Sequence, residues 1–438
     1  MGEQKSEVLS RQQFQQIASR LDVGGDLFFV GNLDGLIEQF VDDLLSGLSA
    51  VPAKTPGDQT IKESMGRLQS FLGKNGFFAF RGVGASIKPR SDGDHSVKIF
   101  IQRDNIDSGL PLWRGLVGWH PRRLICLDFL PPDTAFAYAA TLEMESIWNL
   151  LNSAVKEVVP KKTAETFAMN ITKTQNFMGM GVGQILSSLA NELFVSVQLS
   201  SKEKIILPTS VGFVTIPEPS FLACTAVEDE TLRALIEIQI SKRGKTVVEK
   251  QVGAYVMRYV ERPLFPLLKI QPAYASCSGF FIMGSSPEVV EKALLSYAHK
   301  SGLVARREFK NAFRGLTMIN NGIIYAAPAM GKAIAKIKTN YLESIRTTIP
   351  QHPATEKIIS RLIHHSANAS CAYVVQNWKS GIMIAGNSSR SGKDLIADLT
   401  AAPLGLLTAL LMQEKDGVTP YKSPVLQKTN QDHTNPED

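Results

Sequence analysis

The chain contains few cysteines and no cysteine pairing motif. Its 438 residues include four cysteines, and none of them forms the C-x-x-C pair of zinc or redox sites. They are Cys126, Cys224, Cys277 and Cys371, and each lies in a short apolar segment. We therefore predict buried thiols in strands. The alternative, two disulfides in an oxidising compartment, allows three connectivities that the sequence does not distinguish.

Long hydrophobic runs are also absent. The longest candidate, Ala401 to Met412, is shorter than the ~20 apolar residues that span a bilayer, and it contains Pro403. This pattern predicts a buried helix and no transmembrane segment. The first 20 residues are polar and lack the apolar centre of a signal peptide.

Charge of one sign is not concentrated anywhere in the sequence. The chain has 47 Lys and Arg residues against 41 Asp and Glu residues, a formal net charge of +6. Basic pairs such as Arg122-Arg123, Lys161-Lys162 and Arg306-Arg307 are far apart. Because nucleic-acid binders gather such residues on one stripe, we expect solvated loop charges and no nucleic-acid partner. Nucleic-acid binding would require these pairs to converge on one face.

Motifs for catalysis and for cofactor binding are missing as well. The sequence contains no H-E-x-x-H and no G-x-S-x-G, and its seven histidines show no chelating pattern. The segment Gly386 to Asp394 resembles a phosphate-binding loop, but five residues separate its glycines and Asp394 replaces the hydroxyl residue. We interpret it as a turn from a strand to a helix. No catalytic, cofactor-binding or metal-binding residue is predicted, and no cofactor.

One module recurs four times along the chain: a short apolar strand, a turn and an amphipathic helix. Its copies start near Asp26, Asp133, Ser220 and Asn321, and each unit closes with a helix followed by strands. The predicted division is an N-terminal segment (1–20), unit one (21–110), unit two (124–210), unit three (211–315), unit four (316–412) and a disordered tail (413–438).

This repeat predicts an α+β fold of strand-helix-helix-strand units, in which helices cover one face of antiparallel sheets. Ser286, Pro287 and Glu288 are suited to the start of a helix, as N-cap, first position and dipole partner. Trp378 to Gly381 supplies turn residues between two strands, which indicates a hairpin. Thr231 to Ser241 changes from helical spacing to strict alternation, which predicts a helix that gives way to a strand.

A glycine-rich segment between units one and two is the candidate partner-binding loop. Its candidate contact residues are Trp113, Arg114, Trp119, His120, Arg122 and Arg123. Trp and Arg dominate the energetics of protein interfaces, and glycines place them within reach of a partner. The alternative is that both tryptophans fix the linker to the core.

Three segments resemble an uncharacterised bacterial family, domain of unknown function 3352. The opening Leu130-Pro-Pro-Asp-Thr134 is one, the segment that begins at Gly279-Phe-Phe-Ile-Met is another, and Leu303 to Phe313 is the third. The similarity spans roughly Leu124 to Gly386. It implies exported, often envelope-associated proteins without a known activity or catalytic residues.

We therefore expect a non-enzymatic envelope or secreted protein with a binding or scaffolding role. Its partner would be an unknown protein or envelope component. The resemblance implies a periplasmic, envelope-associated or secreted location, with the leader removed from the chain. The alternative function is a hydrolase with a site in a cleft between units, where convergent polar groups would have strongly shifted pKa values.

Overall fold

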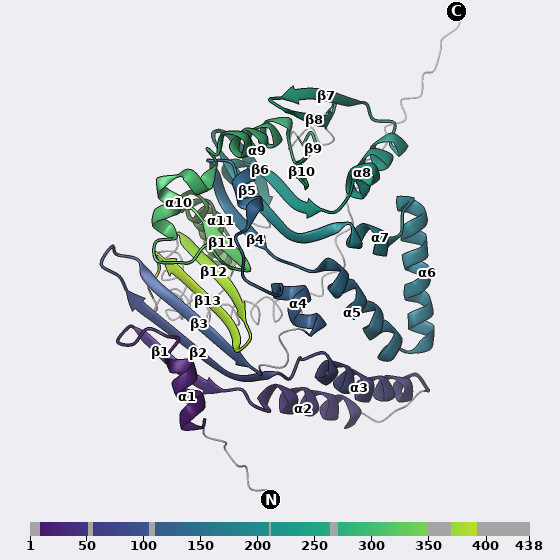
Figure 1. The fold of residues 1–438 in the computed structure, drawn as a ribbon, viewed down its shortest axis with the longest axis vertical. Helices are drawn as coiled ribbons and strands as arrows, with labels where there is room; N and C mark the ends of the chain where they lie inside the picture. Colours follow the sequence, from purple (N-terminus) through teal and green to yellow (C-terminus); the bar gives the residue numbers. More distant parts are fainter. Residues whose placement is uncertain are drawn as a thin grey trace, which may run out of the picture. The chain divides into compact units, whose positions relative to one another are not determined.

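The structure is a computed structural model that describes residues 9–50, 56–104, 110–209, 212–262, 270–348 and 369–391. The strands of this part of the chain form one antiparallel sheet of 13 strands (Figure 1). Residues Met1–Gly392 make up one compact unit. A second unit, Lys393–Asp438, lies outside the described residues, and so do the predicted helix Ala401 to Met412 and the predicted disordered tail.

The strands alternate with helices along the chain. The strands are β1 (Leu27–Asn32), β2 (Phe80–Pro89), β3 (His95–Arg103), β4 (Thr134–Ala140), β5 (Leu189–Thr209), β6 (Gly212–Val227), β7 (Val247–Val252), β8 (Tyr255–Val260), β9 (Ala273–Cys277), β10 (Phe280–Gly284), β11 (Gly322–Ala326), β12 (Cys371–Trp378) and β13 (Gly381–Ser388). The α-helices are α1 (Arg11–Ala18), α2 (Leu36–Ala50), α3 (Pro56–Lys74), α4 (Pro111–Val117), α5 (Met144–Glu157), α6 (Lys161–Met178), α7 (Val182–Ser187), α8 (Thr231–Lys242), α9 (Pro287–His299), α10 (Arg307–Ala312) and α11 (Pro328–Thr348). Two short 3-10 helices are η2 (Ile125–Phe129) and η4 (Leu303–Ala305).

The order of the strands in the sheet brings distant parts of the sequence together. It runs β1-β2-β3-β13-β12-β11-β4-β5-β6-β10-β9-β8-β7. Strand β3, the last strand of the segment predicted as unit one, pairs with β13, the last described strand of unit four. Strand β11 of unit four pairs with β4 of unit two. The sequence predicted separate sheets, whereas the structure has one continuous sheet, because these pairings satisfy strand edges that separate sheets would leave open.

The main core lies on one face of the sheet. Residues directly opposite each other on antiparallel strands point to the same face. One such row runs through Cys224, Phe194, Ala139, Ile323 and Val374, and all five are at most 2% exposed. Further side chains of this core come from other strands, from α9 and α10, and from the two 3-10 helices.

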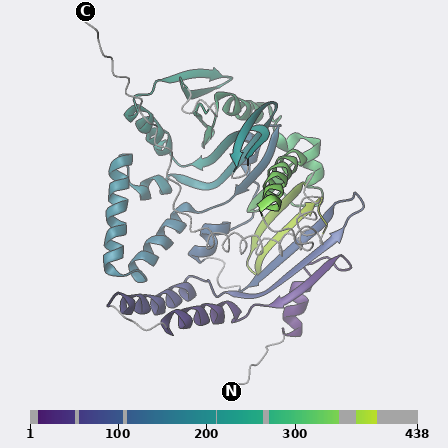
Figure 2. The ribbon, with the colours of Figure 1, turned by 180° about the vertical axis from the view of Figure 1, so that it is seen from behind.

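Helices also pack on the opposite face. Ile384 and Ala385 are neighbours in β13 and therefore point to opposite faces. Ala385 contacts the main core, whereas Ile382 and Ile384 form a second cluster with Trp113 of α4. Helix α11, in front of the strands in Figure 2, packs against β6, β4 and β11. Coverage of one face only, which the sequence predicted, is therefore wrong.

Several local predictions are confirmed. Pro287 begins α9, whose buried face includes Val289, Val290 and Leu294. Strands β12 and β13 form the predicted hairpin. Ser286 occupies the N-cap position of α9, but its side chain makes no capping hydrogen bond.

Two other local predictions are wrong. The segment Thr231 to Ser241 is helical throughout, as part of α8, so the alternation of its isoleucines does not produce a strand. Helix α8 packs against α6 and α7, and this tertiary context outweighs the alternation of the isoleucines. Cys126 lies in the 3-10 helix η2 and not in a strand, whereas the other three cysteines lie in β6, β9 and β12.

Candidate functional site

The candidate partner-binding loop divides between core and surface. Trp113 is 5% exposed on α4, and its ring meets the ring of Phe80 edge-on with centroids 5.0 Å apart. The guanidinium of Arg103 lies 5.2 Å from the centroid of the Trp113 ring. Trp113 thus fixes this segment to the sheet, as the alternative interpretation of the loop proposed.

Trp119, in contrast, is 44% exposed. It stacks on His120 with ring centroids 5.3 Å apart. The guanidinium of Arg114 lies 4.4 Å from the Trp119 ring centroid, and Nε of Arg114 donates a hydrogen bond to Glu143 at 2.9 Å. Trp119, His120 and Arg114 therefore form one ordered surface cluster.

The two arginines at the end of the loop hold it in place. Arg122 donates to the Asn191 carbonyl at 2.7 Å and lies 3.4 Å from the buried carboxylate of Glu192. Its backbone also pairs with that of Asn320. Arg123 forms an exposed ion pair with Asp128 at 3.3 Å. The structure thus brings Arg114, Trp119 and His120 together and assigns Arg122 to anchoring contacts.

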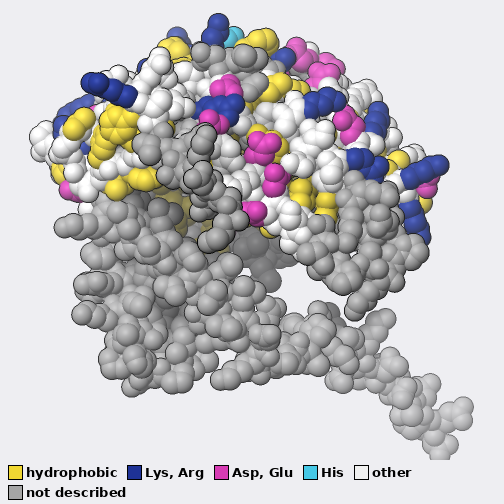
Figure 3. All heavy atoms as spheres, turned by 90° about the horizontal axis from the view of Figure 1, so that it is seen from below, with side chains coloured by type: hydrophobic (Ala, Val, Ile, Leu, Met, Phe, Trp, Pro, Cys, Tyr) yellow, Lys and Arg dark blue, Asp and Glu magenta, His cyan; other side chains and the backbone are white. Residues whose placement is uncertain are grey.

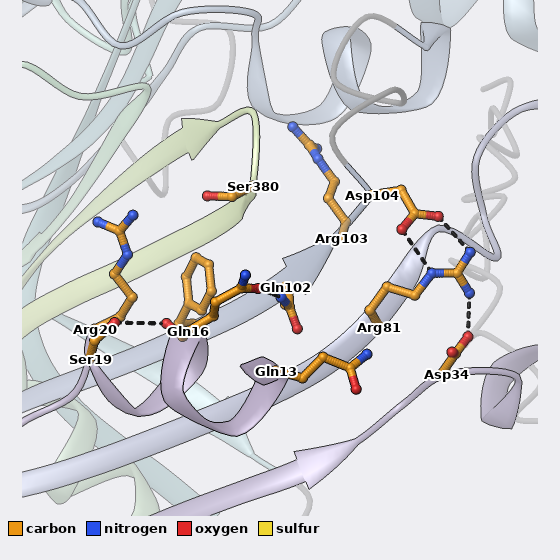
Figure 4. A pocket seen from close by; sticks show the side chains of 11 residues that line it. Gln13, Gln16, Ser19, Arg20, Asp34, Arg81, Gln102, Arg103, Asp104 and Ser380 are labelled. Atoms are coloured by element: carbon orange, nitrogen blue, oxygen red, sulfur yellow. Dashed lines mark hydrogen bonds and ion pairs between the residues drawn. The ribbon is translucent and has the colours of Figure 1, made fainter. Parts of the chain in front are cut away.

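A cavity of about 530 Å³ lies between α1 and the sheet, and the sequence did not predict it (Figure 4). Ligand pockets in proteins have volumes of this order. Most of its lining residues are polar, and the described ones are Gln13, Gln16, Ser19, Arg20, Asp34, Arg81, Phe100, Gln102, Arg103, Asp104 and Ser380.

The position of α1 creates this cavity. A capping box begins the helix: Ser10 and Gln13 bond reciprocally through side chain and backbone. Ile17 is fully buried against Gly82 and Gly84 of β2, where a Cβ would collide with its side chain. These glycines let the helix approach the sheet closely, and its polar face then borders the cavity.

The acidic groups of the cavity are already paired. Nε of Arg81 donates to Asp104 at 2.9 Å, and the same guanidinium pairs with Asp34 (Figure 4). Hydrogen bonding to Asp104 raises the pKa of Arg81 further above its usual value, against the opposing effect of burial. Arg81, Asp34 and Asp104 thus form a hydrogen-bonded group of charged side chains along the cavity.

Arg20 presents the cationic group that has no carboxylate partner in the described part of the chain. Its guanidinium lies 4.8 Å from the Trp378 ring centroid and 6.0 Å from that of Phe100. Gln102 is 9% exposed and donates to the side-chain oxygen of Gln16 at 2.7 Å. The arrangement combines a cation held by aromatic rings with amides, which suits an acidic ligand.

The sequence carries a local signal for this site, although the predicted division gives residues 1–20 only as an N-terminal segment. Ser10 with Gln13 matches the capping box, and Gln13, Gln16 and Arg20 are spaced to share one side of a helix. The cavity also requires β2 and β3, and the residues of α1 do not indicate that the helix packs against these strands.

Three further cavities border the sheet and its helices. One of about 490 Å³ includes Asp22, Lys98 and Arg314, and one of about 320 Å³ includes Asp92, Asp94 and Glu308. Another of about 510 Å³ includes Glu203, Glu218 and Glu288. No histidine lines any of the four cavities, and no group of three metal-ligating side chains occurs among the described residues.

The surface carries mixed charge on the face seen from below. There, described Lys and Arg side chains are scattered among acidic and hydrophobic ones (Figure 3). Of the helices that the structure describes, none has the length and apolar character needed to cross a membrane.

The chain was also compared with known proteins. No protein-family model matches it, and the searches of curated proteins and of solved structures find no match. The resemblance to domain of unknown function 3352 stays a prediction.

Proposed function

We propose that this chain is a non-enzymatic binding protein that holds a small acidic ligand in the cavity beneath α1. The observation that carries this proposal is Arg20, whose guanidinium borders the cavity without a carboxylate partner in the described residues. A carboxylate or phosphate group of the ligand would take that place.

The charges around the cavity support an anionic ligand. Among the described residues, three arginines line it against two aspartates, and both aspartates are bonded to Arg81. An acidic ligand would therefore meet a net positive lining. The planar guanidinium of Arg20 offers paired donors that match carboxylate and phosphate geometry.

Binding can be tested with citrate and inorganic phosphate as probes. We expect each to raise the unfolding temperature of the wild type more than that of Arg20→Gln at the same probe concentration, because a ligand that binds only the folded state stabilises it. Arg20→Gln should weaken probe binding at least ~10-fold, since one charge-assisted contact is lost. Titration calorimetry measures both affinities.

Arg11→Gln is the matched control, because Arg11 lies in α1, which directly precedes the turn that holds Arg20, and does not line the cavity. It should leave probe affinity unchanged. Equal losses in the two variants would show a general charge effect, and an unchanged affinity in Arg20→Gln would contradict the proposal.

We also propose the envelope or secreted location and the four-unit organisation. Short motifs that resemble an exported family support the location. The similar element order of β1-α2-α3-β2-β3 and β11-α11-β12-β13 supports the repeat. Fractionation of cells that express the gene product would test the location, and recovery in the cytosol alone would contradict it. The hydrolase alternative has no named nucleophile and base.

A further inference from the structure

Strand β1 forms one edge of the sheet and pairs only with β2 among the described strands. The N–H of Leu33 donates to the carbonyl of Arg81, which lies on β2. In an antiparallel ladder the bonded residues alternate, so Leu27, Phe29 and Gly31 bond β2. The N–H and C=O groups of Phe28 and Val30 therefore point to the open edge.

The side chains of β1 do not protect this edge. Phe28 is 39% exposed and Phe29 is 50% exposed, and Leu27 to Asn32 contains no charged residue. The opposite edge of the sheet is different: Glu249 and Lys250 lie exposed in the middle of β7. Charged side chains at an edge oppose pairing with another strand. The two edges are thus unequal, and β1 is the one open to a partner strand.

We propose that β1 pairs in antiparallel fashion with β1 of a second copy of this chain. A two-fold axis makes each residue meet the same neutral, aromatic strand, so the surface is complementary to itself. Exchange of the outward N–H and C=O groups of Phe28 and Val30 joins the two sheets.

Charge selects the register of this pairing. With Val30 on the two-fold axis, Asp26 of each copy would lie opposite Asp34 of the other, and like charges directly opposite are destabilising. With Phe29 on the axis, Asp26 lies opposite Asn32 and the repulsion is avoided. The second register also places the two Phe29 rings opposite each other, in a pair of the non-hydrogen-bonded type where side chains are closest.

The first test measures the mass of the full chain by light scattering across a dilution series. The wild type should be a dimer that dissociates on dilution. Phe29→Lys should raise the dimer dissociation constant at least ~100-fold, because each copy loses a buried ring and two lysines meet at the axis. Phe221→Lys is the matched control, since Phe221 is 52% exposed and lies in the internal strand β6.

The second test does not depend on how well a lysine variant folds. Phe29→Cys should form a disulfide-linked dimer under mild oxidation, because non-hydrogen-bonded pairs have Cα atoms about 4.5 Å apart, within disulfide range. Phe221→Cys should not. A wild type that stays monomeric at its highest soluble concentration would overturn the proposal. So would a dimer that Phe29→Lys leaves intact, or equal cross-linking at both positions.

Discussion

Asp22 shows how one residue fixes the segment that follows α1 to the sheet. Its carboxylate accepts hydrogen bonds from Lys98 at 2.7 Å and from Ser96 at 2.9 Å. Its backbone N–H donates to the buried hydroxyl of Ser86 at 3.0 Å. Burial raises the pKa of Asp22, but the bonds from Lys98 and Ser96 outweigh this effect and hold the pKa below 3.8.

A lowered pKa makes stability depend on pH in a defined direction. The carboxylate contributes stability above 3.8, its value in the unfolded chain, and this contribution is lost as pH falls through the folded pKa. We expect Asp22→Asn to cost about 1 kcal/mol near pH 7, because the pair is partly exposed, and to cost less near pH 3. Urea unfolding at both pH values measures this difference.

Asp133→Asn is the control for this prediction. Asp133 forms an ion pair with Lys292 at 2.6 Å, but both side chains are about half exposed, and such pairs contribute little. An Asp22→Asn variant with the same cost at both pH values would contradict the assigned role of its charge.

The turn after α4 depends on a single glycine. Gly118 follows the helix with a φ of +71°, and a Cβ there would collide with the side chain of Thr141. The carbonyl of Gly118 accepts a hydrogen bond from Asn377 of β12, whose side-chain oxygen accepts one from Arg103. The turn therefore connects α4 to a buried polar network in the sheet.

We expect Gly118→Ala to destabilise the protein by about 3 kcal/mol or more, through backbone strain and the collision. Gly93→Ala separates these two effects. Gly93 also has a positive φ, +89°, but nothing lies within 4 Å of a Cβ there, so strain alone should cost about 1 kcal/mol. Thermal unfolding of both variants gives the comparison, and equal losses would show that the contact with Thr141 is unimportant.

The sequence predicts single helices and hairpins better than it predicts which distant segments pack against them. Helix α9 and the β12–β13 hairpin carry their own start, turn and burial signals, so local residues were sufficient. The cavity beneath α1 was missed because it depends on Gly82 and Gly84, which are some 65 residues later in the chain, as the numbering shows. Trp113 and Trp119 look alike in sequence, and only packing against Phe80 separates them.

At the scale of the whole molecule, the reactivity of the cysteine thiols indicates how tightly the sheet and its core are packed. Cys126, Cys224 and Cys277 are free and buried, and Cys371 is free and half-buried. Burial raises the pKa of all four thiols, most strongly at Cys126 and Cys224. A thiol reacts as its thiolate, so both burial and the raised pKa suppress reaction.

We therefore expect slow labelling by a thiol reagent in the native protein, with Cys371 reacting first. In denaturant all four should react at once, and mass spectrometry after labelling assigns each site. Since three of these thiols lie in the main core, their labelling rate in native buffer measures opening of that core. Rapid native labelling of Cys224 would contradict the packing described for β6.

The pairing of β3 with β13 also limits how early this part of the sheet can form during synthesis. Ile99 lies opposite Ile384, so the sheet in this region joins residues almost 300 positions apart in the chain. During synthesis β3 leaves the ribosome long before its partner β13 has been made. The edge of β3 that pairs with β13 stays open until then. The nascent chain would then expose an unpaired apolar strand edge for most of translation. A chaperone that shields such edges would therefore be needed most while the chain is being synthesised.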